Sequence, residues 1–441
     1  MKAEIIAVGS ELLTPDRSDT NSLYLTARLN ALGIEVTRKS IVGDDRAQIV
    51  DTFRAALDRV DVVVSSGGLG PTEDDLTRDA VAELLGRRLE RNEEIVRAIQ
   101  DRFKTLGRPM AENNVRQAMV PEGATILENK RGTAPGLWLE SKQRIVVLLP
   151  GPPRELKAMF EAEVEPRLTR VAPAARLHHR EMRVAGLPES DLDQRIAPIY
   201  KSYADVETTV LAALGEIEVH FRIWSADAAD ADRRLAELER HVALALGEFV
   251  ISTRGESMEQ VVGRLLAAHH ATLATAESCT AGLVAERVTR VAGSSAYFLG
   301  GVVSYSNELK TAFADVPAEM IETFGAVSAE VARALAEGIR RRTGATLGIG
   351  VTGVAGPSGG TAAKPVGTVH VALAAANGAR ERSLMLTGDR ERIRWQASQS
   401  ALDMVRRHFL GVAEPRGGSV RASAATIQSS GAATRITGAK G

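Results

Sequence analysis

Two adjacent side chains that could act as nucleophiles occur in the stretch ATAESCTAGLVAERV. Ser278 and Cys279 stand there between a short apolar run and a helical pattern. A serine at a strand-to-helix turn points its hydroxyl out of the sheet, and the amides that begin the helix can stabilise an oxyanion or a phosphate. Cysteine is the better nucleophile, but one helical position further on its side chain points about 100° away. Because free cysteines are most often small buried apolar residues, we favour Ser278 as the nucleophile.

A serine nucleophile needs a base, and a lysine can replace histidine in that role. Tyr305 ends the strand expected over GGVVSYS, and Lys310 follows five residues later in the next turn. This spacing lets both side chains approach one point above the sheet. A buried or cation-flanked lysine can be neutral near neutral pH, or its charge can lower the pKa of the tyrosine. Taken singly, each of these residue types is more often found at the surface or as a helix cap.

A glycine-rich segment from Gly348 to Gly353 matches the dinucleotide-binding pattern GxGxxG. Pro357 and further glycines follow it, which precludes the helix that such a site requires, and no acidic residue stands about 20 residues on. We therefore interpret the segment as part of a substrate-binding loop. The expected contacts in this loop are Thr352, Gly353 and Gly356.

Two arginines, Arg390 and Arg394, lie four residues apart on a helical stretch near the end of the folded region. At this spacing both guanidinium groups can face one phosphate group. The alternative is that both are solvated surface charges.

A second group of chemically capable residues follows the apolar run DVVVSS, in the order GGLGPTEDDLT. Glycines let backbone amides approach a phosphate closely, and Thr72 can cap the following helix, whose N-terminus adds partial positive charge. Asp74 and Asp75 stand where a divalent cation could bridge carboxylate and phosphate oxygens. The alternative is a tight turn in which the acidic residues serve only as helix-start groups. The candidates for phosphate binding are Gly67, Gly68, Gly70 and Thr72.

The elements that would position these residues form two regions of alternating strands and helices. Up to about residue 170, and again from residue 256 onward, β-rich runs alternate with amphipathic stretches, which is typical of βαβ units on a mostly parallel sheet. Sites in such sheets lie where loops leave the carboxyl ends of the strands. The sequence therefore predicts two α/β domains, residues 1–172 and 255–412, joined by a small α+β module over residues 173–254. The Gly-, Ala-, Ser- and Thr-rich tail, residues 413–441, is expected to be disordered.

Composition excludes several classes of partner. The formal net charge is -1 and aromatic residues make up 4% of the chain, so neither nucleic acid nor a membrane surface is expected to bind. The chain has one cysteine, which rules out an internal disulfide and suits a reducing compartment. No signal peptide or membrane-spanning run is recognisable, and we expect a cytoplasmic protein.

The ordered motifs GSELL, DTNS, GGLGPTEDDLT and PGPPRE resemble the N-terminal domain of the competence/damage-inducible protein A (CinA) family, which is related to molybdenum cofactor biosynthesis proteins. The resemblance implies metal-dependent hydrolysis of ADP-ribose to AMP and ribose 5-phosphate. It places phosphate at the four candidates given above and makes Asp74 and Asp75 metal or water ligands, with the identity of the metal left open. Adenylylation of molybdopterin is a rival activity for this domain.

The motifs TAESCTAG, SYSNELK, VTGVAGPSGG, KPVGTV and GDRERIR resemble the nicotinamide-nucleotide amidohydrolase domain of the same family. The resemblance implies hydrolysis of nicotinamide mononucleotide to nicotinate mononucleotide and ammonia, with Ser278 as the nucleophile, Tyr305 and Lys310 as its base system, and no cofactor. The protein would then be a bifunctional hydrolase that recycles pyridine nucleotides, and a homodimer. The alternative is a non-catalytic factor in competence or the DNA-damage response that senses nucleotides.

The middle module resembles the KH-type linker domain of this family. A KH module that binds nucleic acid uses a GxxG loop, and none occurs between Ala174 and Ser252. We therefore expect no nucleic-acid partner for this module.

Overall fold

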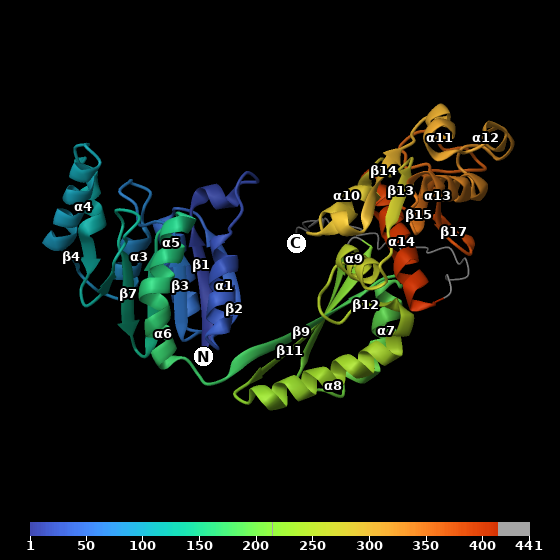
Figure 1. Cartoon of the computed structure of the whole chain (residues 1–441). Helices are drawn as coiled ribbons and strands as arrows, with labels where there is room; N and C mark the ends of the chain where they lie inside the picture. The colour runs from blue at the N-terminus through green and yellow to red at the C-terminus, as the bar shows by residue number, and fades with distance from the viewer. Residues whose placement is uncertain (214, 413–441) are drawn as a thin grey trace, which may run out of the picture. The chain divides into compact units, whose positions relative to one another are not determined.

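The computed structural model describes residues 1–213 and 215–412 of the 441-residue chain. The tail predicted to be disordered, residues 413–441, lies outside the described residues. The chain divides into two compact units, Met1–His178 with Ile223–Arg233, and His179–Arg222 with the residues from Arg234 onward. Along the chain an α/β domain, a small α+β module and a second α/β domain follow one another (Figure 1), which confirms the predicted fold class.

The N-terminal α/β domain is built on a six-stranded sheet with the strand order β2-β1-β3-β8-β7-β6. Its strands are β1 (Lys2–Val8), β2 (Glu35–Val42), β3 (Val62–Ser66), β6 (Thr125–Leu127), β7 (Gly136–Ser141) and β8 (Arg144–Leu149). Strands β2, β1, β3 and β8 run parallel, whereas β7 is antiparallel to both β8 and β6. A separate antiparallel pair consists of β4 (Leu89–Arg91) and β5 (Met119–Pro121). The carboxyl ends of the four parallel strands meet at one edge of the sheet.

Helices cover both faces of this sheet because successive side chains of a strand point to opposite sides. Ile5 of β1 packs with Leu25 in one apolar core. The next residue, Ile6, packs with Phe53 in the core on the other face. The first core is covered by α1 (Asn21–Ala31), α5 (Pro153–Met159) and α6 (Glu165–Val171), and the second by α2 (Arg46–Leu57), α3 (Thr77–Leu84) and α4 (Glu93–Thr105).

The middle module has a four-stranded sheet with the order β10-β11-β9-β12. Its elements are β9 (Arg176–Val184), α7 (Glu189–Tyr200), β10 (Glu207–Ala213), β11 (Glu216–Ser225), α8 (Ala228–Leu246) and β12 (Val250–Ser252). The β10–β11 and β9–β12 pairs are antiparallel. Both helices contribute buried apolar residues, among them Leu192 of α7 and Leu238 of α8. This arrangement is the α+β module that the sequence predicts.

The C-terminal domain is built on a five-stranded sheet with the order β14-β13-β15-β16-β17. Its strands are β13 (Leu273–Glu277), β14 (Phe298–Val303), β15 (Leu347–Gly353), β16 (Thr368–Ala375) and β17 (Gly378–Met385). Strands β14, β13 and β15 run parallel, and β16 and β17 are antiparallel to their neighbours. The mostly parallel sheet predicted here therefore has an antiparallel half.

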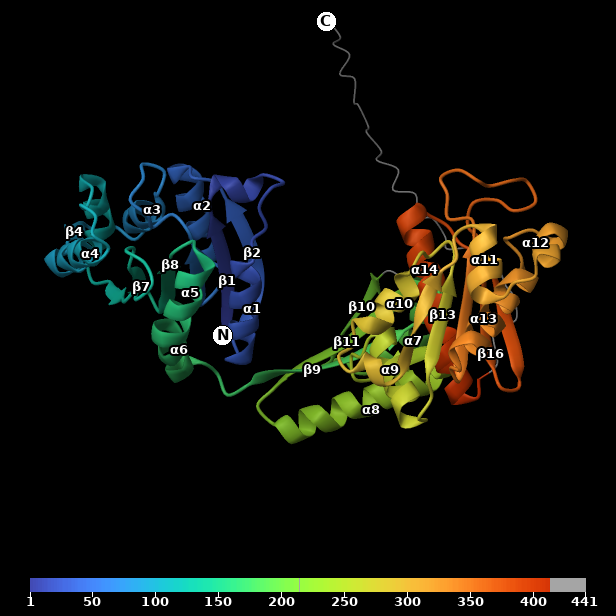
Figure 2. The same ribbon diagram turned by 45° about the horizontal axis from the view of Figure 1, so that its top comes forward.

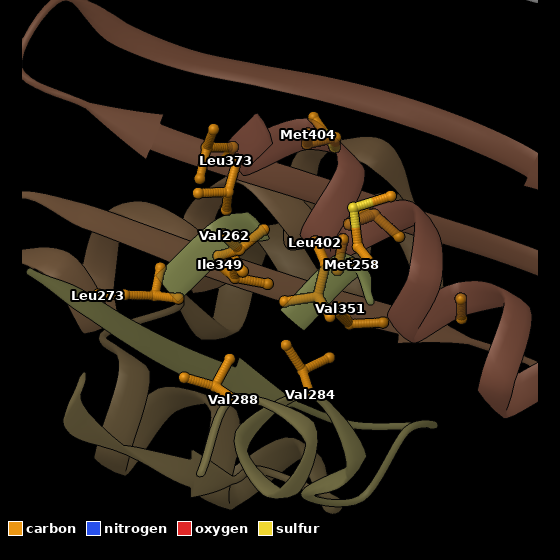
Figure 3. Packing of buried hydrophobic residues seen from close by; sticks show 14 of the residues in the cluster. Met258, Val262, Leu273, Val284, Val288, Ile349, Val351, Leu373, Leu402 and Met404 are labelled. Carbon is orange, nitrogen blue, oxygen red and sulfur yellow. The ribbon is translucent and has the colours of Figure 1, made fainter. Parts of the chain in front are cut away.

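Two apolar cores flank this sheet. Leu273 of β13 packs with Val284 and Leu402 in the core shown in Figure 3, whereas the adjacent Ala274 packs with Leu335 on the opposite face. Helices α9 (Met258–Ala268), α10 (Leu283–Thr289) and α14 (Arg390–Leu410) cover the first core, and α11 (Asn307–Ala314), α12 (Ala318–Phe324) and α13 (Ala329–Thr343) cover the second. In both views α11 and α12 are neighbours at one end of the domain (Figure 1, Figure 2).

Residues singled out for chemistry follow the carboxyl ends of parallel strands in both α/β domains. Gly67 directly follows β3, and Ser278 directly follows β13. The expected placement of the sites at these strand ends is therefore confirmed for both residues. No helix within the described ranges combines the length and the apolar character needed to cross a bilayer.

Candidate functional site

A cavity of about 720 Å³ lies at the carboxyl ends of β1, β3 and β8 in the N-terminal domain. Gly9, Ser66 and Pro150, at or just beyond the ends of these strands, line it together with the loops that follow. The structure brings all six N-terminal candidates to this one cavity. They are Gly67, Gly68, Gly70, Thr72, Asp74 and Asp75.

Close contacts require glycine at two positions of this loop. A Cβ atom at Gly67 would lie 2.1 Å from the carbonyl oxygen of Val8, and one at Gly68 would lie 2.0 Å from the hydroxyl of Thr77. The amide of Gly67 donates to Leu149 and is not available to a ligand. The amides of Gly68, Leu69 and Gly70, by contrast, have no acceptor in the part of the chain that the structure describes. Three free donors therefore lie along the rim of the cavity.

Thr72 does not cap the following helix, so that prediction is wrong. Helix α3 begins at Thr77, and the residue before it, Leu76, provides no side-chain cap. Thr72 instead donates its amide to the Asp75 carboxylate at 2.8 Å, and its hydroxyl donates to the same oxygen. Thr72 therefore orients the Asp75 carboxylate.

The residues of this cavity fit a divalent cation that is shared with a phosphate ligand. Among the described residues, no group of three or more His, Cys, Asp or Glu side chains is arranged to hold a metal ion. Magnesium, however, is usually bound by one or two carboxylates together with phosphate oxygens and water. Asp74 and Asp75, beside three free amides, offer such a partial set of ligands.

Asn21 is a cavity residue to which the sequence reasoning gave no role, although it lies in the DTNS motif. Its side-chain amide donates to the Ser66 hydroxyl at 2.8 Å and to the Gly151 carbonyl at 2.8 Å. These bonds tie the ends of β3 and β8 to the start of α1. Its carbonyl oxygen is buried without a partner in the described chain. The position of Asn21 in the DTNS motif is the sequence feature from which this role could have been predicted.

In the C-terminal domain Ser278 directly follows β13, and its amide donates to the Val351 carbonyl of β15 at 2.9 Å. The expectation that amides at the start of the next helix stabilise an oxyanion is wrong. The buried carboxylate of Glu277 accepts from the amides of Val284 at 3.0 Å and Ala285 at 2.9 Å, so these donors are occupied. Within the described residues, the amides of Cys279 and Thr280 have no oxygen acceptor. These two amides are therefore the donors that remain next to Ser278.

Cys279 belongs to the apolar core, as expected of a free cysteine. Only 4% of the residue is exposed, and it is part of the same cluster as Val284 and Val351. Burial raises the pKa of its thiol to about 12. The thiolate, which is the nucleophilic form, is therefore scarce at neutral pH.

This burial predicts that Cys279 resists alkylation. At pH 8 we expect iodoacetamide to label the native protein at least about 100-fold more slowly than the urea-unfolded protein, because an unfolded thiol has a pKa near 8.5. Intact-mass spectrometry measures the rate, and the chain's single cysteine makes the result unambiguous. Rapid stoichiometric labelling of the native protein would contradict the burial of this thiol.

Tyr305 lies in the loop that follows β14, whereas Lys310 belongs to helix α11. Strand β14 ends at Val303, so Tyr305 lies two residues beyond it. The buried ammonium of Lys310 donates to the carbonyls of Ser304 at 3.0 Å, Tyr305 at 3.1 Å and Ser306 at 3.5 Å. The side chain of Tyr305 is 56% exposed, and no hydrogen bond within the described chain joins it to the Lys310 side chain.

The Lys310 amino group is surrounded by three backbone carbonyls. Three carbonyl acceptors match the three hydrogens of an ammonium group, although burial lowers the pKa of Lys310. Its charge and its hydrogen bonds fix the backbone that carries Tyr305. Lys310 thus binds the backbone of the loop that carries Tyr305, whereas the side chain of Tyr305 is exposed to solvent.

Arg390 and Arg394, at the start of α14, connect three separate loops. Arg390 donates to the Gly356 carbonyl at 2.8 Å and to the Tyr305 hydroxyl at 3.2 Å. Arg394 donates to the carbonyl of Thr280, in the Ser278 loop, at 2.7 Å. The structure therefore gathers the Ser278, Tyr305 and Gly356 loops around one end of α14. Both guanidinium groups bind the protein, although Arg390 is also exposed to solvent.

The GxGxxG segment lies in a strand, since β15 spans Leu347–Gly353. A Cβ atom at Gly348 or Gly350 would lie 2.2 Å from a backbone oxygen of α13. These glycines let α13 pack closely on the sheet, which confirms that the dinucleotide pattern is coincidental. Thr352 is buried and its hydroxyl donates to the Ala326 carbonyl at 2.7 Å, so this hydroxyl is engaged within the protein.

Replacement of Gly350 by alanine tests the packing role of these glycines. The added methyl group would overlap the backbone of Ala332, and we expect a loss of about 1–3 kcal/mol in the free energy of unfolding. Urea denaturation of the full chain measures this loss. Unchanged stability together with weakened nucleotide binding would contradict a purely structural role for Gly350.

Comparison with known proteins adds independent information. Residues 4–170 match the family described as "Probable molybdopterin binding domain", residues 179–252 match "Damage-inducible protein CinA KH domain", and residues 255–409 match "CinA C-terminal domain". The chain is 51% identical to a CinA-like protein of Koribacter versatilis over 414 residues, which cover 93% of this chain and 100% of the relative. It is 50% identical to a CinA-like protein of Solibacter usitatus over 411 residues, 93% of this chain and 99% of the relative. The crystal structure of CinA from Thermoplasma acidophilum is 36% identical, with a TM-score of 0.36, and covers 38% of this chain and 97% of its own.

Proposed function

Because the chain belongs to the CinA family, we propose that its C-terminal domain hydrolyses nicotinamide mononucleotide to nicotinate mononucleotide and ammonia. The observation that carries this proposal is the gathering of three loops around Arg390 and Arg394, with Ser278 on one of them. Two guanidinium groups beside a serine hydroxyl suit a substrate that has both a phosphate and a carboxamide.

In this reaction Tyr305 acts in its phenolate form. The Ser278 hydroxyl oxygen attacks the carboxamide carbon, and the hydroxyl proton passes to the Tyr305 oxygen. The amides of Cys279 and Thr280 stabilise the oxyanion that forms. The carbon–nitrogen bond then breaks, the nitrogen takes up the proton, and ammonia leaves. Water hydrolyses the remaining ester, which yields the carboxylic acid and restores the Ser278 hydroxyl. This serine route requires no metal ion.

Tyr305 is the proton acceptor in this scheme because Lys310 is occupied. Three carbonyls hold the Lys310 ammonium, which leaves it no free lone pair. Arg390 donates a hydrogen bond to the phenol oxygen and another to the Gly356 carbonyl, which fixes the position of the Tyr305 side chain. Lys310 therefore acts on the reaction through the loop that carries Tyr305.

Ammonia release from nicotinamide mononucleotide by the purified full chain, with a chelator present, tests the proposal. We expect steady release that chelation leaves unchanged. A nucleotide sensor, the alternative from a different class, would bind the nucleotide and release no ammonia over hours. That outcome would indicate that the protein is a nucleotide sensor in competence or the damage response and would contradict the proposed enzymatic activity.

For the N-terminal domain we propose divalent-metal-dependent hydrolysis of ADP-ribose to AMP and ribose 5-phosphate. Asp74 and Asp75 would hold the cation, which would neutralise the charge of the pyrophosphate. The free amides of Gly68, Leu69 and Gly70 would bind a phosphate oxygen, while Gly67 contributes through its backbone conformation. AMP formation that requires magnesium or manganese would support this activity.

The description of the family matched by residues 4–170 names molybdopterin, which keeps a second activity open for this domain. Transfer of AMP to molybdopterin by the purified protein, without AMP formation from ADP-ribose, would favour that activity. In either case we propose a cytoplasmic homodimer that recycles pyridine nucleotides and has no nucleic-acid or membrane partner.

A further inference from the structure

Arg78, in the first turn of α3, is a buried cation without a compensating partner. Only 2% of the residue is exposed. Its single hydrogen bond is a long one, from Nη1 to the Leu69 carbonyl at 3.5 Å, and its Nε atom has no acceptor among the described residues. No carboxylate in the described chain comes within ion-pair distance of it. Asp79 and Asp75 are the acidic groups that act on it, and burial nevertheless lowers its pKa.

The other fully buried arginines of the described chain are all paired. Arg287 lies 2.9 Å from Glu259, and Arg406 and Arg407 lie 2.7 Å and 2.9 Å from Asp403. Charged side chains are rarely buried unless they are paired, because removing an ion from water is unfavourable. Arg78 is the exception among the fully buried arginines that the structure describes.

The Leu69–Gly70 peptide lies between Arg78 and the cavity, and the charge of Arg78 can polarise it. The Leu69 carbonyl faces Arg78, and in a trans peptide the carbonyl and the following N–H point in opposite directions. The Gly70 amide therefore points away from Arg78, and Gly70 lines the cavity. This amide has no acceptor in the described chain, so the guanidinium group polarises a peptide whose free hydrogen is directed away from it.

We propose that Arg78 supplies the positive charge that binds the pyrophosphate of a nucleoside diphosphate ligand in the N-terminal cavity, acting through the Leu69–Gly70 peptide. This inference rests on the proposed function only for the placement of the ligand. Two further cavity residues, Asn21 and Gln117, carry buried side-chain oxygens without partners in the described chain. These oxygens could accept hydrogen bonds from the ligand's ribose hydroxyls.

Calorimetric titration of the full chain with ADP-ribose, in a chelating buffer that prevents hydrolysis, tests this role. We expect Arg78→Met to raise the Kd at least about tenfold, and Arg78→Lys to stay within about threefold of the parent. Arg144→Met is the matched control, since it removes the same charge from an arginine that is paired with Asp61 at 2.8 Å and lies at the other end of β8. Its Kd is expected to remain within about twofold of the parent.

Thermal melting of the same variants supplies the second readout. Arg78→Met removes a cation that lacks a protein partner, so its melting temperature should equal or exceed that of the parent. A clear fall in melting temperature, or an unchanged Kd, would overturn the proposal and make Arg78 a structural residue. An equal loss of binding in Arg144→Met would overturn it as well, since the net charge of the domain would then explain the effect.

The failure of this inference is distinguishable from that of the proposed function. If the parent binds ADP-ribose in an Arg78-dependent way but forms no AMP when magnesium is added, the pyrophosphatase proposal fails and the role of Arg78 stands. If the parent binds neither ADP-ribose nor inorganic pyrophosphate, the role of Arg78 is overturned.

Discussion

Replacement of Ser278 by alanine is expected to lower ammonia release from nicotinamide mononucleotide by about 10³-fold or more. The hydroxyl oxygen is the atom that forms the bond to the carboxamide carbon, and the neighbouring Cys279 thiol cannot substitute for it. That thiol is buried in the apolar core with its pKa raised to about 12, mainly by burial. A coupled assay for ammonia on the full chain measures the loss.

Cys279→Ala is the matched control for this experiment, because it alters the adjacent residue and removes a nucleophile of the same kind. We expect its rate to stay within a few fold of the parent, with some loss of stability from the smaller side chain. Loss of activity in Cys279→Ala with full activity in Ser278→Ala would assign the reaction to the sulfur and contradict the scheme.

Replacement of Lys310 by methionine is expected to lower kcat by about 10²-fold, because small displacements of a catalytic group have effects of that size. Methionine removes the ammonium that binds the carbonyls of Ser304, Tyr305 and Ser306, so the loop that carries Tyr305 loses its anchor. Steady-state kinetics as a function of pH measure the effect. The pH profile of kcat should shift to higher pH in the variant, because a positive charge near the base has been removed.

Two further variants separate this role from a general effect on stability. Lys310→Arg should not restore the rate, because the planar guanidinium does not fit a buried site built for a compact ammonium. Glu308→Gln, on the same helix but exposed, should stay within about twofold of the parent. A Lys310→Met enzyme with the parental rate and pH profile would contradict the anchoring role.

The elements and site residues that could be predicted are those marked by a pattern within a short stretch of sequence. The runs that form β3 and β8 are short and almost continuously apolar, and the glycines around Gly68 mark the turn that follows β3. Ser278 and Gly67 were placed correctly at strand ends because the strand-to-helix alternation alone determines that position. The burial of Cys279 followed from its residue type.

Features that depend on contacts between distant segments were not predictable from the sequence. The capping role assigned to Thr72 failed because the loop continues to Leu76 and the Asp75 carboxylate takes the Thr72 donors. No local sequence pattern indicates that the Glu277 carboxylate binds the amides at the start of α10. Arg78 resembles any helical arginine in the sequence, and its isolation is visible only once the surrounding core is known.

Rapid acid quenching of the full chain during turnover of nicotinamide mononucleotide, followed by peptide mass spectrometry, tests the central claim most directly. The account predicts a covalent adduct of the acyl nucleotide on Ser278, absent from the Ser278→Ala variant and unaffected by a chelator. Ammonia release from the Ser278→Ala variant at the parental rate, with no adduct on Ser278 in the parent, would contradict it.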